Sequence, residues 1–236
     1  HIPEIICKAL APAMSEVVPA CSGGEVVSMM GVGKHPVTGK VWLEATNEAV
    51  GFGGHAGGDG ENGIMHLSEP GCRNNPVEVL ENKAPLLIEA YYLRQDSCGA
   101  GEHRGGLGAT RIYRFTAPGN AVTIVKKTKT RPWALNGGLE GDPNHIIVWP
   151  GTDREWRTGA INQPLQAGDV LISSAGGGGG WGNPLRRSPD KVLEDVRDGY
   201  VSLESAKRDY GVVIDTTNWT VDTEATAALR RERAGA

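Results

Sequence analysis

The chain has 236 residues, a net charge of −4 and a hydrophobic fraction of 39%. No apolar run approaches the roughly 18 residues that a membrane-spanning helix needs. The weakly acidic balance also provides no basic field for nucleic acid. We therefore expect a globular protein that binds neither membrane nor nucleic acid. The 34 glycines and 14 prolines predict many turns and closely approaching backbones, not a helical bundle.

The cysteine spacing indicates the cellular compartment of the protein, and the first residues indicate how it relates to a longer subunit. Cys7, Cys21, Cys72 and Cys98 form no C-x-x-C pair, which favours reduced thiols in a cytoplasmic protein over disulfides. The chain begins at His1, without an initiator Met or a signal peptide. We expect it to be a portion of a longer subunit.

The first fifty residues predict a helix and two strands. Pro3 suits the first turn of a helix over 3–14, and Pro12 is expected to end it. Residues 25–50 contain two runs with strand character, separated by a turn around residues 35–40.

Residues 51–66 are rich in glycine and carry three potential metal ligands: His55, Asp59 and His66. Imidazole and carboxylate are the ligand types that a divalent metal takes, so these residues are candidates for a metal site. Their spacing is that of a loop and not of a helical ligand pair. The alternative is that the glycines form tight turns while Asp59 accepts hydrogen bonds from nearby backbone N–H groups.

The next ordered run, residues 77–97, is divided by Pro85. We expect a short strand or helical turn before this proline and a strand over 86–94 after it. Glu78 and Glu81 would share a face of a helical turn, where they could transfer protons or brace the turn.

A second glycine cluster, residues 98–108, precedes a strand over 109–115, and together they predict a strand, a tight turn and a returning strand. Arg104 lies beside a glycine pair and could hold a carboxylate or phosphate in a bidentate manner. The alternative is an ion pair between Arg104 and Asp96 that pins the hairpin. Cys98 could be a nucleophile, but the sequence places no histidine to activate it.

Short strands continue along the chain and end at a run of five glycines. Serial strands with turns between them predict an antiparallel sandwich or barrel over about residues 85–175. The expected strands lie within residues 121–130, 145–151, 153–159 and 169–174. Gly176–Gly180 then form either a flexible loop or a segment in which the backbone approaches a ligand or another chain closely. We favour close approach, because the run is short, follows a strand and precedes Trp181.

The tail predicts helices. Ser188 and Pro189 are typical first residues of a helix, and Gly199 is a typical end. Ser202 and Gly211 delimit a second helix in the same way. A strand at 212–215 and a terminal helix over 223–236 complete the expected elements.

These patterns predict an α+β, β-rich fold of short, mainly antiparallel strands, arranged as a sandwich or barrel, with a small C-terminal helical segment. We expect three regions. Residues 1–84 form a glycine-rich α/β segment that continues a domain begun upstream. Residues 85–185 form a β-rich domain, and residues 186–236 form the helical segment.

Four motifs resemble the hydantoinase B/oxoprolinase family. Residues 177–215, which begin GGGGWGNPLRRSP, are similar to its C-terminal signature. Residues 94–108 match its R-x-D-S-G-G-x-G-x-x-R-G-G-x-G pattern except at Cys98, where the family has glycine. The glycine-rich stretch that ends at His66 and the N-x-P-x-E-x-x-E run from Asn74 match two further motifs, although His55 stands where the family has a small residue.

The resemblance implies the B-type subunit of an enzyme that hydrolyses hydantoins, 5-oxoproline or related lactams with ATP. ATP and Mg would bind a companion A-type subunit, which phosphorylates the small-molecule substrate. A possible divalent metal would lie in the N-terminal portion of the same B-type subunit, outside this chain. The isolated chain is therefore expected to be inactive.

The resemblance also implies site residues. Asp59, His66 and Arg104 would act in catalysis. Residues that bind substrate or a neighbouring subunit would be Asp96, Gly105, Gly106, Gly176, Gly177 and Gly178.

Two alternatives remain open at the level of sequence. One is a subunit of an ATP-dependent ketone carboxylase of the acetone or acetophenone type. The other is a non-catalytic assembly domain of such a complex.

Overall fold

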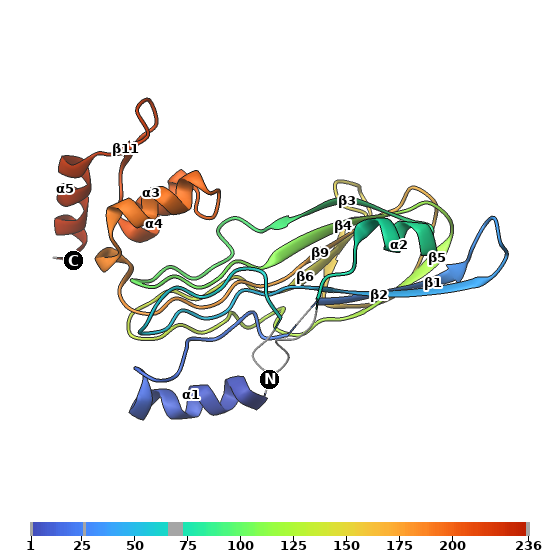
Figure 1. Cartoon of the computed structure of the whole chain (residues 1–236), viewed down its shortest axis with the longest axis horizontal. Helices are drawn as coiled ribbons and strands as arrows, with labels where there is room; N and C mark the ends of the chain where they lie inside the picture. The colour runs from blue at the N-terminus through green and yellow to red at the C-terminus, as the bar shows by residue number, and fades with distance from the viewer. Residues whose placement is uncertain (1, 26, 66–72, 235–236) are drawn as a thin grey trace.

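The computed structural model describes residues 2–25, 27–65 and 73–234 of the chain. Two β-sheets lie at one end of the molecule and the C-terminal helices at the other, with extended segments running between them (Figure 1). Among the described residues, no helix combines the length and apolar character needed to cross a bilayer.

Antiparallel pairing joins the strands of the two main sheets. The first sheet has the order β2-β1-β5-β8 and comprises β1 (Val27–Lys34), β2 (Val41–Glu48), β5 (Gly119–Ile124) and β8 (Ala160–Leu165). The second has the order β3-β4-β9-β6-β7 and comprises β3 (Leu86–Leu93), β4 (Ala109–Phe115), β6 (His145–Val148), β7 (Trp156–Thr158) and β9 (Val170–Ser174). The first sheet therefore takes two strands from each side of the boundary expected at residue 84.

One core cluster draws side chains from both sheets. Met29 and Trp42 of the first sheet and Tyr113 and Phe115 of the second are buried in it. Alternation places these side chains inward, while Leu43, next to Trp42, is exposed. The predicted α+β class with short antiparallel strands is confirmed, and the strand orders give two open sheets.

Most helices and strands follow local signals, with one correction for a helix and one for a strand. Pro12 lies inside α1 (Ile2–Met14), two residues before its end, and does not stop it there. A proline within a helix removes one backbone hydrogen bond and can kink the helix without ending it. The predictions missed β8, which contains Pro164; this strand forms a sheet edge, where proline is tolerated. The remaining elements are α2 (Val77–Lys83), η1 (Pro184–Arg186), α3 (Pro189–Arg197), α4 (Leu203–Tyr210), β10 (Ile214–Asp215), β11 (Thr220–Val221) and α5 (Thr223–Ala234).

Helix ends at the C-terminus agree with the sequence signals in most respects. The Ser202 side chain accepts a hydrogen bond from the Ser205 N–H at the start of α4, and Gly211 ends this helix with a φ of 62°. Ser188 precedes α3 as expected, but its side chain makes no capping hydrogen bond. An apolar cluster that includes Val192, Ala206 and Tyr210 holds these helices together.

Between the sheets and the helices lies what we call the glycine bundle: residues 20–24, 51–60, 97–108, 132–142 and 176–181. These segments run side by side as extended chain without regular strands (Figure 1), and hydrogen bonds join their backbones. The Gly178 N–H donates to the Gly106 carbonyl at 2.9 Å, and the Gly178 carbonyl accepts from the Gly99 N–H at 2.7 Å. Residues 97–108 thus run through the bundle, and the tight turn expected between β3 and β4 is wrong.

The central segment 176–181 shows why this bundle needs glycine. A methyl group at Gly177 would lie 2.1 Å from the Ser97 carbonyl oxygen, and one at Gly180 would lie 2.1 Å from that of Ala100. A methyl group at Gly178 would instead lie 1.8 Å from the Phe52 carbonyl oxygen. The side of the backbone that faces residues 97–108 therefore recurs after three residues, from Gly177 to Gly180. Three residues is the period of a polyproline II helix.

Space, and not backbone conformation, is therefore what Gly176–Gly180 provide. None of these five residues has a positive φ. The run is closely packed and not slack, but the neighbours that approach it are other segments of this same chain. Close approach to a ligand or another chain stays a prediction.

Gly178→Ala tests this packing. The new methyl group would overlap the fixed backbone of Phe52 and Gly53, so we expect the free energy of unfolding to fall by about 3 kcal/mol or more. Urea denaturation measures it. Gly58→Ala is the matched control, because its methyl group would lie 3.9 Å from the His55 side chain at an ordinary φ. Equal, small losses in the two variants would contradict the packing argument.

Candidate functional site

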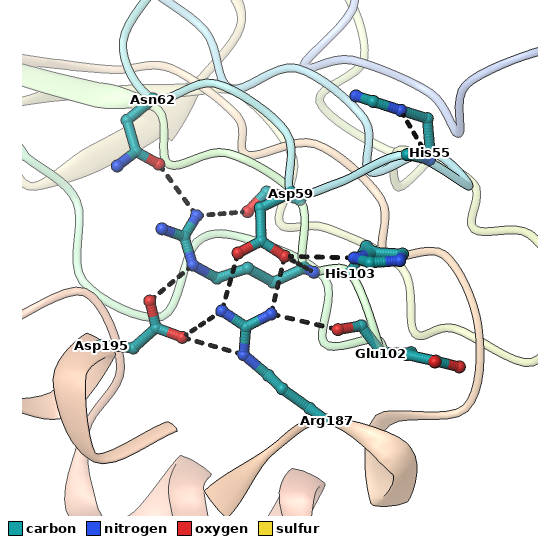
Figure 2. A network of polar contacts seen from close by, with 10 residues as sticks. His55, Asp59, Asn62, Glu102, His103, Arg187 and Asp195 are labelled. Atoms are coloured by element: carbon teal, nitrogen blue, oxygen red, sulfur yellow. Dashed lines mark hydrogen bonds and ion pairs between the residues drawn. The ribbon is translucent and has the colours of Figure 1, made fainter. Parts of the chain in front are cut away.

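A network of charged side chains, buried except for the partly exposed Asp59, joins the glycine bundle to the C-terminal helices (Figure 2). Arg187 donates to both carboxylate oxygens of Asp59, at 2.6 and 2.8 Å. Its Nε and Nη2 also donate to Asp195 Oδ2, at 3.1 and 2.8 Å. Arg104 Nε donates to the other oxygen of Asp195 at 2.8 Å. Two guanidinium groups and two carboxylates thus form one continuous, charge-balanced chain.

Each partner comes from a different part of the fold. Asp59 and Arg104 lie in the glycine bundle, where the Arg104 N–H donates to Asp59 Oδ1 at 2.9 Å. Arg187 follows η1, and Asp195 projects from α3. The Arg104 guanidinium also lies 5.1 Å from the centre of the Tyr200 ring. The network therefore fixes the helical segment against the bundle.

The electrostatics keep Asp59, Arg104 and Arg187 charged. Burial acts to raise the pKa of Asp59, but hydrogen bonds and charge from Arg187, with the charge of Arg104, hold that pKa below its usual range. Burial acts to lower the pKa of Arg187 and of Arg104, yet Asp59 and Asp195 raise both above the ordinary value. Ion pairing with each other holds these groups in their charged forms, so they are poorly suited to proton transfer at neutral pH. These contacts favour a structural role for Asp59 and Arg104.

The expected ion pair between Arg104 and Asp96 is wrong. Asp96 Oδ1 accepts instead from the Ser202 N–H at 2.8 Å, and so ties the bundle to the start of α4. Arg104 has Asp195 as its carboxylate partner because α3 packs on the bundle, a long-range contact that local spacing does not reveal.

The proposed metal ligands do not converge in the described part of the chain. His55 Nδ1 accepts from the Gly57 N–H at 3.1 Å, and its ring lies apart from the Asp59 carboxylate (Figure 2). His66 lies outside the described residues. Within residues 2–25, 27–65 and 73–234, no group of three His, Cys, Asp or Glu side chains is arranged for a metal ion.

The remaining predicted positions are packed against this chain's own backbone. A methyl group at Gly105 would lie 2.0 Å from the Gly178 carbonyl oxygen, and one at Gly106 would lie 1.8 Å from that of Glu61. Gly176 donates to Asn144 Oδ1 at 2.5 Å. Burial raises the pKa of the Cys98 thiol to about 12, which disfavours a thiolate nucleophile. A role for these glycines in binding substrate or a subunit stays a prediction.

A second buried cluster, which the sequence predictions missed, lies between the two sheets. Glu48 is fully buried, and its Oε2 lies 3.2 Å from Arg111 Nε. The Tyr113 hydroxyl donates to the other oxygen of Glu48 and lies 2.5 Å from the Thr46 hydroxyl. Burial raises the pKa of Glu48 to about 7, against the charge of Arg111 and hydrogen bonds from Tyr113 and Ser173.

The alternation of inward and outward residues along β2 and β4 could have indicated this buried cluster. Glu48 shares the inward face of β2 with Trp42 and Thr46, and Arg111 shares that of β4 with Tyr113. An acid and a base on inward faces of two strands indicate a buried pair. Asp195 has a similar signal, because it lies among the apolar residues of α3.

A cavity of about 240 Å³ opens beside Arg111. The ends of β2, β3 and β4 meet there with the segment that leads into α2. Its border includes Thr46, Asn47, Arg73, Asn74, Asn75, Tyr91 and Arg111.

The hydantoinase B/oxoprolinase family model matches residues 1–184, and the chain belongs to this family. The putative B-type subunit of a D-/L-hydantoinase from Pseudomonas sp. (strain NS671) is 31% identical over 98% of this chain and 38% of its own length.

Two solved structures share the fold. The ATP-dependent caprolactamase from Pseudomonas jessenii matches with a TM-score of 0.83 at 31% identity, over 95% of this chain and 40% of its own. The nucleotide-free acetone carboxylase matches with a TM-score of 0.77 at 21% identity, over 96% of this chain and 35% of its own. The chain thus spans about two fifths of the length of these relatives.

Arg187→Ala tests the buried network. The change leaves Asp195 buried without one of its two cationic partners, so the free energy of unfolding should fall by about 3–5 kcal/mol. Urea denaturation at pH 7 measures the loss. Its exposed neighbour gives a matched control, since Arg186→Ala should stay within about 0.5 kcal/mol of wild type. Similar values for both variants would show that the network contributes nothing to stability.

Proposed function

We propose that this chain is the C-terminal portion of the B-type subunit of an ATP-dependent cyclic amide hydrolase. It would act with an A-type subunit that binds ATP and Mg²⁺ and forms a phosphorylated intermediate. The observation that carries the proposal is the family match over residues 1–184. The likeness to the caprolactamase, at 31% identity, supports a hydrolase in particular.

The charges of the site favour an auxiliary role for this chain in catalysis. Its buried network commits Asp59 and Arg104 to Arg187 and Asp195. The border of the cavity beside Arg111 includes two arginines and three asparagines. This part of the subunit would therefore hold and orient polar groups of the substrate, while the phosphoryl chemistry takes place with the A-type subunit. We assign no divalent metal to the described residues of this chain, because no three of their His, Cys, Asp and Glu side chains form a ligand set.

Reconstitution tests the proposed function. The chain is produced alone, and then together with the rest of the B-type subunit and the A-type subunit. Each preparation receives MgATP with hydantoin, 5-oxoproline or ε-caprolactam, and ring opening and ADP release are measured. We expect ring opening coupled to ADP release in the complete assembly and none with the isolated chain.

Two results would contradict the proposal. Turnover by the isolated chain would show that this portion carries a complete site. A complete assembly that consumes ATP only with a ketone and bicarbonate would make the protein a carboxylase subunit.

A further inference from the structure

Helix α1 turns its apolar side to solvent. Five of its large apolar side chains are between 42% and 73% exposed, namely Ile2, Ile5, Ile6, Leu10 and Met14. The side that meets the glycine bundle instead carries Glu4, which is buried. A surface helix normally does the reverse and packs its apolar stripe on the core. The orientation of α1 on this chain is therefore inverted.

A carboxylate holds α1 to the rest of the chain. Both oxygens of Glu4 accept from the Ser22 N–H at 3.3 Å, and the Ser22 hydroxyl donates to one of them. Ala11 is the other buried residue of the helix. Directly after the helix, the Ser15 carbonyl accepts from Trp181 Nε1 at 3.1 Å. These contacts fix α1 on the bundle and leave its large apolar side chains exposed.

The sequence of the helix explains this arrangement. Successive residues turn by about 100°, so Glu4 and Ala11 share one side and Ile6 lies opposite them. The charged residues of α1 are Glu4 and Lys8, and both lie away from that opposite side. We call the opposite side the outward arc; it consists of Ile2, Ile5, Ile6, Ala9, Leu10, Ala13 and Met14. A helix that is apolar on nearly every side is typical of a buried position in a larger protein.

A groove beside α1 continues the outward arc. It has a volume of about 620 Å³ and lies between the helix and residues 127–133. Ile5 and Ala9 border it on the helix, and Trp133 borders it on the other side. The volume equals the liquid volume of about twenty water molecules, which is room for several side chains of a packed segment. Its charged border residues are Glu4, which is bonded to Ser22, and three cations, Lys8, Lys127 and Arg131. A segment in this groove would place apolar side chains against the helix and acidic side chains near the cations.

We propose that the outward arc and the groove beside it bind the part of the B-type subunit that lies outside this chain. The chain covers 38% of the length of the D-/L-hydantoinase relative, so about three fifths of that relative lies outside the match. In the proposed C-terminal portion, the preceding polypeptide leads directly into α1 and so lies nearest to the arc. The inference thus rests on the proposed function for the identity of the partner.

The composition of the arc favours a permanent contact over a transient one. Interfaces that form and dissociate are about as polar as the rest of the protein surface, whereas permanent ones resemble a domain core. An arc made of isoleucine, leucine, methionine and alanine has the composition of a core. A second portion of the same subunit, which stays with this chain after folding, meets that requirement.

Co-expression tests the proposal. The 236-residue chain, carrying an affinity tag, is produced together with the rest of the B-type subunit, and the equimolar complex is isolated and quantified. Ile6→Glu and Leu10→Glu each place a charge in the apolar contact, where burying it without a partner is unfavourable. We expect each variant to reduce the recovered complex at least tenfold.

Val37→Glu is the matched control. Val37 is also an exposed apolar residue, but it lies in the turn between β1 and β2, and this hairpin extends away from α1 (Figure 1). The recovered complex should be unchanged. Thermal unfolding of each chain on its own separates a lost contact from a folding defect. Because Ile6 and Leu10 are exposed in this chain, all three variants should unfold at the wild-type temperature.

Several results would overturn the proposal. Wild-type recovery of the complex with both α1 variants would do so, and so would an equal loss with Val37→Glu. A lower unfolding temperature of the α1 variants would show that the arc packs within this chain. A wild-type chain that dimerises in sedimentation velocity and becomes monomeric with Leu10→Glu would assign the arc to a second copy.

Failure of this inference is distinguishable from failure of the proposed function, because the co-expression uses neither ATP nor substrate. A complex that forms through α1 but opens no ring in the turnover assay would refute the proposed hydrolase alone. Ring opening by an assembly whose recovery the α1 variants leave unchanged would refute the interface alone.

Discussion

The structure depends on the direct approach of backbones in the glycine bundle. At Gly178 a single methyl group would fall 1.8 Å from a carbonyl oxygen, a distance that no rotamer change can relieve. The segments that meet there come from residues 20–24, 51–60, 97–108, 132–142 and 176–181, and hydrogen bonds from one to the next replace a regular sheet. Buried backbone groups need such partners. Glycine composition is therefore a packing requirement here and not a sign of flexibility.

The two charged clusters depend on this scaffold in different ways. Asp59 and Arg104 are held by bundle segments, so they present a fixed surface to Arg187 and Asp195 of the helical segment. At the sheet end, Gly63 borders the cavity and donates to the Leu107 carbonyl at 2.8 Å, so bundle contacts also shape the cavity wall. One rigid element thus fixes the helices and supports the wall of the cavity.

Local elements could be predicted from the sequence, and long-range pairing could not. The strands over 86–94 and 109–115 and the helix ends at Ser202 and Gly211 follow from neighbouring residues, and the structure contains them. The family resemblance is also confirmed. Arg187 was missed because its partner Asp59 lies 128 positions away. Arg104 was paired with Asp96 for the opposite reason, since closeness in sequence suggested a contact that the path of the bundle does not make. The cavity was missed because three strand ends create it together.

Hydrogen exchange measured by NMR tests the central claim most directly. In the bundle the N–H groups of Gly178, Gly179 and Gly180 donate at 2.9, 2.8 and 2.9 Å to three different segments. They should exchange as slowly as amides in the central strands of the sheets, because they open only when the fold opens. Exchange at the rate of an exposed loop would show that the glycine run is slack, and would contradict the close packing of the bundle.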